Sequence, residues 1–329
     1  MRGVGLVYSP SMAKGKHPGL MRRRHRRAAA VVSIVLGGLA SSAFAQELTP
    51  AAYTPAPNGV NLVMITSAYN SGDLAFDPAV PIDDANAEIF SSAFGYLRTL
   101  GVAGRAANIS ITAPFVLGEI EGIYLGEQAF AKRSGLGDIG VRFAVNLFGA
   151  QAMSPKEFST FRPRTLIGAS LVVTAPTGEY DPTKMINIGT NRWGFKPEIG
   201  IVHVMKRWAI DAYLGGWFFT DNTDFFGGLT REQDSIIATQ FHVRYLIQRG
   251  LWVAVDGNFW RGGQTTIGGT VNDDMQQNSR VGLTVSMDLR RGHSLRVATS
   301  RGAVTRIGGD FTSIGVSYGY SWMRKPKSN

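Results

Sequence analysis

Short segments in which apolar and polar side chains alternate recur along the chain from Gly59 onward. In one of the clearest, every second residue is apolar: Ile139, Val141, Phe143, Val145 and Leu147. Alternation with a period of two puts the two kinds of side chain on opposite faces of a β-strand, whereas a helical face repeats about every 3.6 residues. The chain is therefore constrained to form a sheet with one apolar face and one polar face.

The alternating segments predict twelve strands: 59–69, 86–99, 106–117, 137–147, 165–175, 193–205, 208–219, 236–247, 251–260, 280–289, 294–300 and 311–322. Short connections, such as Lys206-Arg207 and 248–250, alternate with long ones, such as 176–192 and 261–279. An even number of strands with short turns at one end and long loops at the other is typical of an outer-membrane barrel. We expect an all-β fold over residues 59–322, a transmembrane antiparallel β-barrel of twelve strands with short periplasmic turns and long extracellular loops.

A soluble β-sandwich is the alternative, because its strands also alternate. A water-soluble barrel would put its apolar face inward, and twelve strands enclose a space too wide for side chains to fill. Aromatic side chains favour the two interfaces of a bilayer, and all six tryptophans lie at or near predicted strand ends: Trp193, Trp208, Trp217, Trp252, Trp260 and Trp322. These observations favour the membrane barrel.

The polar faces of the strands predict the lining of the lumen. If it carries a solute, the path consists of Arg142, Lys196, Glu198, Asp211, Trp217, His242, Arg244, Asp256, Asn258 and Trp260. Counting back from the short turns places His242 opposite Asp256, Gln240 opposite Asn258 and Asp288 opposite Arg296. The inward Trp217 and Trp260 would offer surfaces on which flat rings stack.

Little in the sequence points to catalysis. His242 with Asp256 is the one pair that resembles general-base chemistry, and no serine nucleophile signature accompanies it. The chain has no Cys, and the histidines after residue 45, His203, His242 and His293, lack metal-ligand spacing. We therefore expect no catalytic residues, no metal, no cofactor and no enzymatic activity.

The N-terminal region reads as a secretory leader. A basic stretch follows Met21, an apolar stretch runs over 28–40, and Ala43-Phe44-Ala45 fits a cleavage site. We expect a signal peptide over residues 1–45, with Met21 as the true start, cleavage after Ala45 and export to the outer membrane of a Gram-negative bacterium. The apolar stretch is shorter than the roughly 20 residues of a membrane-spanning helix.

Removal of the leader changes the charge of the chain. Of 34 basic residues, eight precede the first acidic residue, Glu47, which leaves 26 basic against 24 acidic residues. A nearly neutral mature chain offers no basic patch for nucleic acid. The Pro-rich residues 46–58 predict a flexible N-terminal segment, too short for a plug domain, and a basic tail covers 323–329.

Four stretches carry a resemblance to a known family. They are SGLGD at 134–138, PTGEYDPTKMINIGTNRWGFKPEIG at 176–200, WVAVDGNFWRGG at 252–263 and QNSRVG at 277–282. Together they resemble the family called MetA-pathway of phenol degradation, over nearly all of the mature chain. The resemblance implies an outer-membrane transporter for aromatic or other small apolar compounds, and it brings no catalytic residues.

We therefore expect an outer-membrane channel for passive uptake of small aromatic or hydrophobic compounds. Expected partners are these solutes, outer-membrane lipid and lipopolysaccharide, and the barrel-assembly machinery. A structural or adhesive barrel without transport is the alternative, and a barrel enzyme acting on lipids is a third, which would need the serine or histidine constellation that the sequence lacks.

Overall fold

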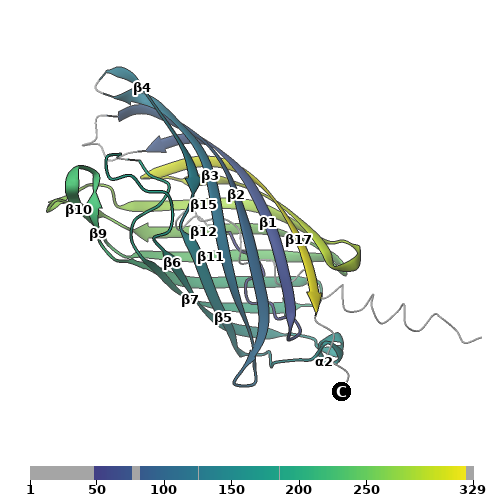
Figure 1. Ribbon diagram of the computed structural model, residues 1–329. Coiled ribbons are helices and arrows are strands. Elements are labelled where there is room, and N and C mark those ends of the chain that lie inside the picture. The colour runs from purple at the N-terminus through teal and green to yellow at the C-terminus, as the bar shows by residue number, and fades with distance from the viewer. Residues whose placement is uncertain (1–47, 76–81, 125, 185, 324–329) are drawn as a thin grey trace, which may run out of the picture.

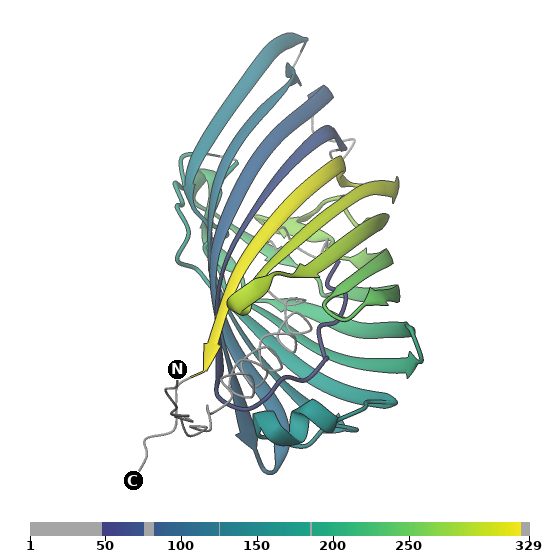
Figure 2. The same ribbon diagram turned by 90° about the vertical axis from the view of Figure 1, so that its right-hand side faces the viewer.

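The computed structural model describes residues 48–75, 82–124, 126–184 and 186–323, which form a closed antiparallel β-barrel (Figures 1 and 2). Its wall consists of β1 (Val60–Ala75), β2 (Ile82–Val102), β3 (Arg105–Tyr124), β4 (Glu127–Leu136), β5 (Ile139–Phe148), β6 (Thr165–Ala175), β7 (Gly194–Met205), β8 (Trp208–Phe219), β11 (Ile236–Gln248), β12 (Leu251–Gly262), β15 (Gln276–Asp288), β16 (His293–Val304) and β17 (Gly308–Met323). Both β4 and β5 pair with β3 and share one position, so the ring has twelve. Pairing of β1 with β17 and of β2 with β3 closes it.

The twelve predicted strands are confirmed, and each matches one position in the ring. The sequence leaves 118–136 as a connection, but residues 118–124 extend β3 and residues 127–136 return as β4, beyond the neighbouring strands (Figure 1). Gly137 and Asp138 interrupt the strand between β4 and β5. Most side chains of β4 are exposed on both faces, so the period-two signal that marks a strand is missing there.

Apolar side chains cover the outer face of the wall. Large exposed ones come from strands all around the ring, for example Ile65, Phe94, Leu214, Val255 and Ile314. In a barrel the lipid-facing and lumen-facing residues alternate, so this face is the one that contacts the bilayer. The part of the chain described here contains no helix of the length and hydropathy that crossing a membrane requires.

The tryptophans divide equally between the two faces of the wall. Trp193, Trp208 and Trp322 are exposed near strand ends, as expected for rings at the membrane interface. Trp217, Trp252 and Trp260 are buried inside the barrel. The polar faces of the strands predict the inward position of Trp217 and Trp260. These three buried rings do not support the membrane-interface argument, because lying near a strand end does not decide which face a side chain occupies.

The two ends of the barrel differ. At the turn end, where β1 begins and β17 ends, the connections are 103–104, 206–207, 249–250, 289–292 and the longer 149–164. The last contains helix α2 (Pro155–Thr160), capped by Ser154, whose hydroxyl accepts a hydrogen bond from the Glu157 N–H. The Ser154 hydroxyl and N–H in turn donate to the Glu157 carboxylate, which lowers its pKa.

At the loop end, the connections predicted as 220–235 and 261–279 form a small second sheet. It comprises β9 (Asn222–Phe225), β10 (Leu229–Gln233), β13 (Thr265–Ile267) and β14 (Thr270–Val271), in the order β14-β13-β10-β9. The sheet lies beyond the rim of the barrel (Figure 1). Its strands have two to five residues, too few to show a period in the sequence.

The N-terminal segment, residues 48–58, lies inside the lumen. Residues 49–57 are buried, and Ala52 and Tyr53 pack in one cluster with Phe158 of α2 and with Leu166 and Val202 of the wall. The sequence predicts a flexible segment too short to form a plug. In the structure these residues are buried, and inward side chains of the wall supply hydrogen-bond partners for a backbone that pairs with no strand. The predicted signal peptide, its cleavage site and tail residues 324–329 lie outside the described residues.

Candidate functional site

The ten predicted lumen residues all lie inside the barrel, and each is at most 9% exposed. They are Arg142, Lys196, Glu198, Asp211, Trp217, His242, Arg244, Asp256, Asn258 and Trp260. Two cross-strand pairs predicted by counting from the tight turn at 248–250 are also confirmed: His242 lies opposite Asp256, and Gln240 lies opposite Asn258. The alternation of the sequence therefore predicts correctly which side chains share the inner face.

One prediction of register is wrong. Asp288 lies opposite Ser294, and Arg296 lies opposite Ser286. Pairing of Asp288 with Arg296 would require five residues, 290–294, in the turn. Only Arg290–Gly292 lie between Leu289 and His293, and the Leu289 N–H donates to the His293 carbonyl at 2.8 Å. Because the turn is two residues shorter than predicted, Asp288 pairs with a residue of β16 that lies two positions earlier in the sequence than Arg296.

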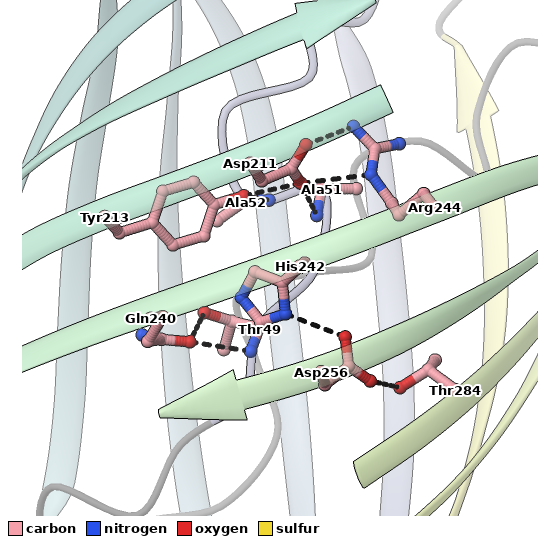
Figure 3. A network of polar contacts seen from close by, with 10 residues as sticks. All are labelled: Thr49, Ala51, Ala52, Asp211, Tyr213, Gln240, His242, Arg244, Asp256 and Thr284. Carbon is pink, nitrogen blue, oxygen red and sulfur yellow. Dashed lines mark hydrogen bonds and ion pairs between the residues drawn. The ribbon is translucent and has the colours of Figure 1, made fainter. Parts of the chain in front are cut away.

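Asp211 fastens the N-terminal segment to the wall (Figure 3). Its Oδ2 accepts hydrogen bonds from the Ala51 N–H (2.9 Å), the Tyr213 hydroxyl (2.9 Å) and Arg244 Nε (3.0 Å), and its Oδ1 accepts from Arg244 Nη2 (2.9 Å). The Tyr213 hydroxyl also accepts from the Ala52 N–H, 3.1 Å. A fully buried carboxylate with four donors is strongly fixed, so it anchors the segment at this height.

A second set of contacts lies beside it on β11 and β12. The Thr49 N–H and hydroxyl both donate to Gln240 Oε1, at 2.9 and 3.0 Å. His242 Nδ1 lies 2.7 Å from Asp256 Oδ1, and the Thr284 hydroxyl donates to Asp256 Oδ2 at 2.6 Å (Figure 3). Asp256 stands between the histidine and the hydroxyl, so Thr284 is not placed as a nucleophile next to its base.

Tyr53 occupies a notch in the wall. Gly168 on β6 and Gly200 on β7 lie opposite each other, and a Cβ at either would overlap the Tyr53 ring. The Tyr53 hydroxyl lies 3.0 Å from the Ser170 hydroxyl and donates to the Glu198 carboxylate at 2.9 Å. Two opposed glycines therefore let a buried ring approach the backbone of the wall.

Three further charged side chains, Lys196, Glu198 and Arg142, lie close to Tyr53 in the lumen. Lys196 Nζ lies 3.1 Å from Glu198 Oε2, and the Glu198 carboxylate also interacts electrostatically with the Arg142 guanidinium. The Arg142 guanidinium lies over the Tyr53 ring, 5.3 Å from its centroid. In this part of the lumen, charged side chains pack against one another and against the Tyr53 ring. Within the described residues no cluster of three or more His, Asp or Glu could hold a metal ion.

Trp217 and Trp260 pack in one buried cluster with Ile236 and Ala238. The indole N–H of Trp260 donates to Gln276 Oε1 at 2.9 Å. Neither ring lines the cavity described next. Their inward orientation matches the sequence prediction, but in this structure they serve as core side chains.

A cavity of about 310 Å³ lies between the N-terminal segment and the loop end. Leu48 borders it, as do side chains on the inner faces of β1, β2, β3, β15, β16 and β17. Its lining includes Ala68, Ile89, Val116, Ile120, Ala298 and Phe311. None of the ten predicted lumen residues contributes; the lining is largely apolar or small, and its inward arginines, Arg280 and Arg296, lie outside the predicted set.

One long loop completes the cavity. Residues 176–193 bring Ile186 and Ile188 to its lining. Asp138, at the break between β4 and β5, holds the loop: its Oδ1 accepts from the Gly178 N–H at 2.8 Å, and its Oδ2 accepts from the Thr190 N–H and hydroxyl at 2.9 and 2.6 Å. Two of the stretches that carry the family resemblance, 134–138 and 176–200, therefore build one structural unit.

Comparison with known structures finds other barrels. The COG4313 outer membrane channel from Pseudomonas putida F1 is 21% identical, with a TM-score of 0.71 over 84% of this chain and 100% of that one. The transport unit of the autotransporter AIDA-I from Escherichia coli (10% identical, TM-score 0.48, 92% and 99% covered) and the CymD monoaromatic hydrocarbon channel (7%, 0.42, 83% and 90%) are more distant. At these identities the likeness concerns the fold alone.

The sequence comparisons give a sharper result. No curated protein matches this chain. The family described as MetA-pathway of phenol degradation matches residues 65–322, nearly the whole barrel from the first strand to the last. The chain therefore belongs to the MetA-pathway of phenol degradation family and folds as an outer-membrane β-barrel.

Proposed function

We propose that this protein is an outer-membrane channel for passive uptake of small aromatic or otherwise apolar compounds, which bind in the cavity above the N-terminal segment. The observation that carries the proposal is the cavity itself, an apolar space enclosed by the barrel wall and the 176–193 loop. Its volume, about 310 Å³, is at the lower end of the range for pockets that hold small molecules.

The lining suits brief binding. Ile89, Val116 and Ile188 offer apolar contact that strengthens with the buried area of the solute and has no fixed geometry. A passive channel needs binding that is favourable enough to admit a solute and weak enough to release it. Contacts of this kind also tolerate solutes of differing shape.

Passage toward the turn end requires the N-terminal segment to shift, because residues 49–57 are buried across that part of the lumen. The segment belongs to no strand and is held by side-chain contacts such as Ala51 to Asp211, Thr49 to Gln240 and Tyr53 to Glu198. Each such hydrogen bond contributes on the order of 1 kcal/mol, or about 1.5–3 where one partner is charged. Displacement of the segment therefore does not require a strand to leave the sheet.

Filling the cavity tests the proposal. Ala298 lines the cavity from β16, and the adjacent Val297 faces outward, so Ala298→Phe and Val297→Phe add a similar side chain to opposite faces. The assay is the initial uptake rate of radiolabelled toluene by intact cells that lack the chromosomal gene and carry either variant. We expect Ala298→Phe to reduce uptake to the rate of the empty vector and Val297→Phe to preserve it. Equal uptake by all strains would contradict the proposal.

We further propose that the protein reaches the outer membrane after cleavage of residues 1–45, with barrel-assembly machinery as its folding partner and lipopolysaccharide as its lipid neighbour. The supporting observations are the basic and apolar stretches before Ala45 and the apolar outer face of the barrel. N-terminal sequencing of the protein from outer-membrane fractions should begin at Gln46. A mature protein that begins before residue 28 would contradict the signal peptide.

A structural or adhesive barrel remains the second candidate, and one observation favours it. The small sheet at the loop end carries exposed apolar side chains, Leu229 and Val271, next to Phe226. Removal of the β13–β14 hairpin distinguishes the two functions. If the protein is an adhesive barrel that binds through this sheet, the deletion should abolish adhesion and leave toluene uptake unchanged.

A further inference from the structure

The N-terminal segment has one large side chain. Residues 49–57 are Thr, Pro and Ala apart from Tyr53, which is the only aromatic residue among them. Tyr53 is 2% exposed and packs in one cluster with Leu166 and Val202 of the wall. Because the smaller side chains bury less apolar area, the place of the segment in the lumen depends strongly on where this one ring is held.

The notch that holds the ring is formed by four neighbouring strands, β5 to β8. Gly168 lies nearest to Cδ1 of the Tyr53 ring and Gly200 nearest to Cε2. The Arg142 guanidinium lies over the ring, and the Tyr213 ring meets it edge-on, with the two centroids 5.1 Å apart and the planes at 78°. A cation over a ring face and an edge-to-face contact are attractive for aromatic rings in general.

The polar end of the notch is built for a hydroxyl group. The Tyr53 hydroxyl donates to Glu198 Oε1 at 2.9 Å and lies 3.0 Å from the Ser170 hydroxyl. Glu198 is itself positioned by Lys196, whose Nζ lies 3.1 Å from the other carboxylate oxygen. A hydrogen bond to a charged acceptor is stronger than one between neutral groups, so a ring with a hydroxyl fits this notch better than a plain hydrocarbon.

The side chain that fills the notch is itself a phenol, joined to the chain through its Cβ. We propose, on the basis of the channel function proposed above, that the notch is a second binding site and takes phenols, small aromatic rings with a hydroxyl group, in exchange for Tyr53. The phenol donates to Glu198, and its ring lies under Arg142. Neither residue lines the cavity above the segment, so the two sites are distinct.

Exchange of a phenol for Tyr53 also changes the state of the lumen. The segment loses the contacts of its one large side chain and keeps smaller ones, such as those of Thr49 with Gln240 and of Ala51 with Asp211. It therefore leaves the lumen more easily, and a phenolic solute opens its own route toward the turn end. Solutes without a hydroxyl group pass when the segment shifts unaided.

Tyr53 competes with the solute from within the same chain. A group on a short tether competes at an effective concentration in the millimolar range. We therefore expect phenols to displace Tyr53 at about millimolar concentrations, and the segment to stay in place when no phenol is present.

Binding to an emptied notch tests the chemistry of the site. Tyr53→Ala removes the ring, and p-cresol has the structure of the part removed. Calorimetry uses the mature protein in lipid nanodiscs, with binding to empty nanodiscs subtracted, and compares p-cresol with toluene, which lacks the hydroxyl. We expect Tyr53→Ala to gain a site for p-cresol that the wild type does not show at the same concentrations, with an affinity at least about tenfold higher than that for toluene.

Two glycine substitutions locate the gained site. Gly168→Ala, added to Tyr53→Ala, should abolish the site because the new Cβ takes the space of the ring. Gly140→Ala is the matched control: Gly140 shares the inner face of β5 with Arg142, a Cβ there would meet no atom within 4 Å, and the site should persist. Tyr69→Ala, on the outer face of β1, should create no site.

Conductance in a planar bilayer tests the exchange in the wild type. We expect p-cresol to raise the conductance and toluene at the same concentration to change it little. Tyr53→Phe keeps the ring but lacks the hydrogen bond to Glu198, so p-cresol should act on it at about tenfold lower concentration. Tyr53→Ala should conduct more than the wild type without p-cresol and should not respond to it further. A general effect of p-cresol on the bilayer would not depend on residue 53.

The exchange is overturned if Tyr53→Ala gains no site for p-cresol, or if p-cresol acts on the wild type and on Tyr53→Phe at the same concentration. If Tyr53→Ala does not fold, the comparison with Tyr53→Phe decides alone. Cellular uptake of radiolabelled toluene separates this proposal from the channel function. Uptake above that of the empty vector, together with either negative result, would refute the exchange alone, whereas uptake equal to the empty vector would refute the proposed function.

Discussion

Replacement of Asp211 by Ala should destabilise the barrel more than any other single lumen change, because its carboxylate joins the N-terminal segment to the wall. The substitution leaves Arg244 buried without its acceptor and removes the acceptor of the Ala51 N–H and of the Tyr213 hydroxyl. Breaking a buried ion pair from one side costs about 3–5 kcal/mol. We expect a loss near the middle of that range, since the Arg244 side chain retains some exposure.

The assay is urea-induced unfolding in lipid vesicles, followed by tryptophan fluorescence, with planar-bilayer conductance measured in parallel. Asp211→Ala should also raise the conductance, because the segment is held less firmly. The paired variant Asp211→Leu with Arg244→Met should recover most of the stability, since an apolar pair replaces a buried ion pair at little cost. A loss below about 1 kcal/mol for Asp211→Ala, or a paired variant as unstable as the single one, would refute the reasoning.

Three further changes test other parts of the account. Gly168→Ala should lower the free energy of unfolding in urea by about 1–3 kcal/mol, because the added Cβ overlaps the Tyr53 ring. In a chain that already carries Tyr53→Ala, Gly168→Ala should cost less. An equal cost in both backgrounds would contradict the contact between Gly168 and Tyr53. Val255→Arg, mid-strand on the lipid face, should cost about 2–4 kcal/mol, whereas Gln248→Arg at the turn end should cost at most about 1; the reverse order would invert the faces. Because the chain has no Cys, a single introduced cysteine reports on which side of the membrane its loop lies. Asp273→Cys should react with an impermeant maleimide on intact cells, and Gln248→Cys should react only after permeabilisation. Labelling of Gln248→Cys alone on intact cells would indicate the opposite orientation.

The alternation of the sequence predicts much of the barrel, because in a strand it decides both the secondary structure and the face of each residue. Residues 137–147 and 280–289 are examples in which the inward set follows directly. The extension of β3 into β4 could not be predicted in this way, because beyond the apolar band both faces of a strand meet water. The small sheet at the loop end was missed since strands as short as Thr270–Val271 carry no period.

Only part of the candidate site could be predicted from the sequence, because the sequence determines which residues pair across neighbouring strands but not which residues meet across the lumen. Tight turns fix register, so His242 could be placed opposite Asp256 from the sequence. The cavity depends instead on residues that meet across the lumen, such as Val116 and Ala298, and no local pattern relates them. The burial of residues 49–57 could not be predicted either, although the glycines at 168 and 200 were a signal, since both lie at inward positions where the wall leaves room for Tyr53.

The measurement that tests the central claim most directly is a crystal structure of the mature protein soaked with iodobenzene, whose iodine gives anomalous density. We expect a peak inside the barrel, between Ala298 on one side of the cavity and Ile89 and Val116 on the other. The Ala298→Phe variant should show none at that position. Density confined to the outer, lipid-facing surface in the wild type, or no density within the barrel at saturating iodobenzene, would contradict it.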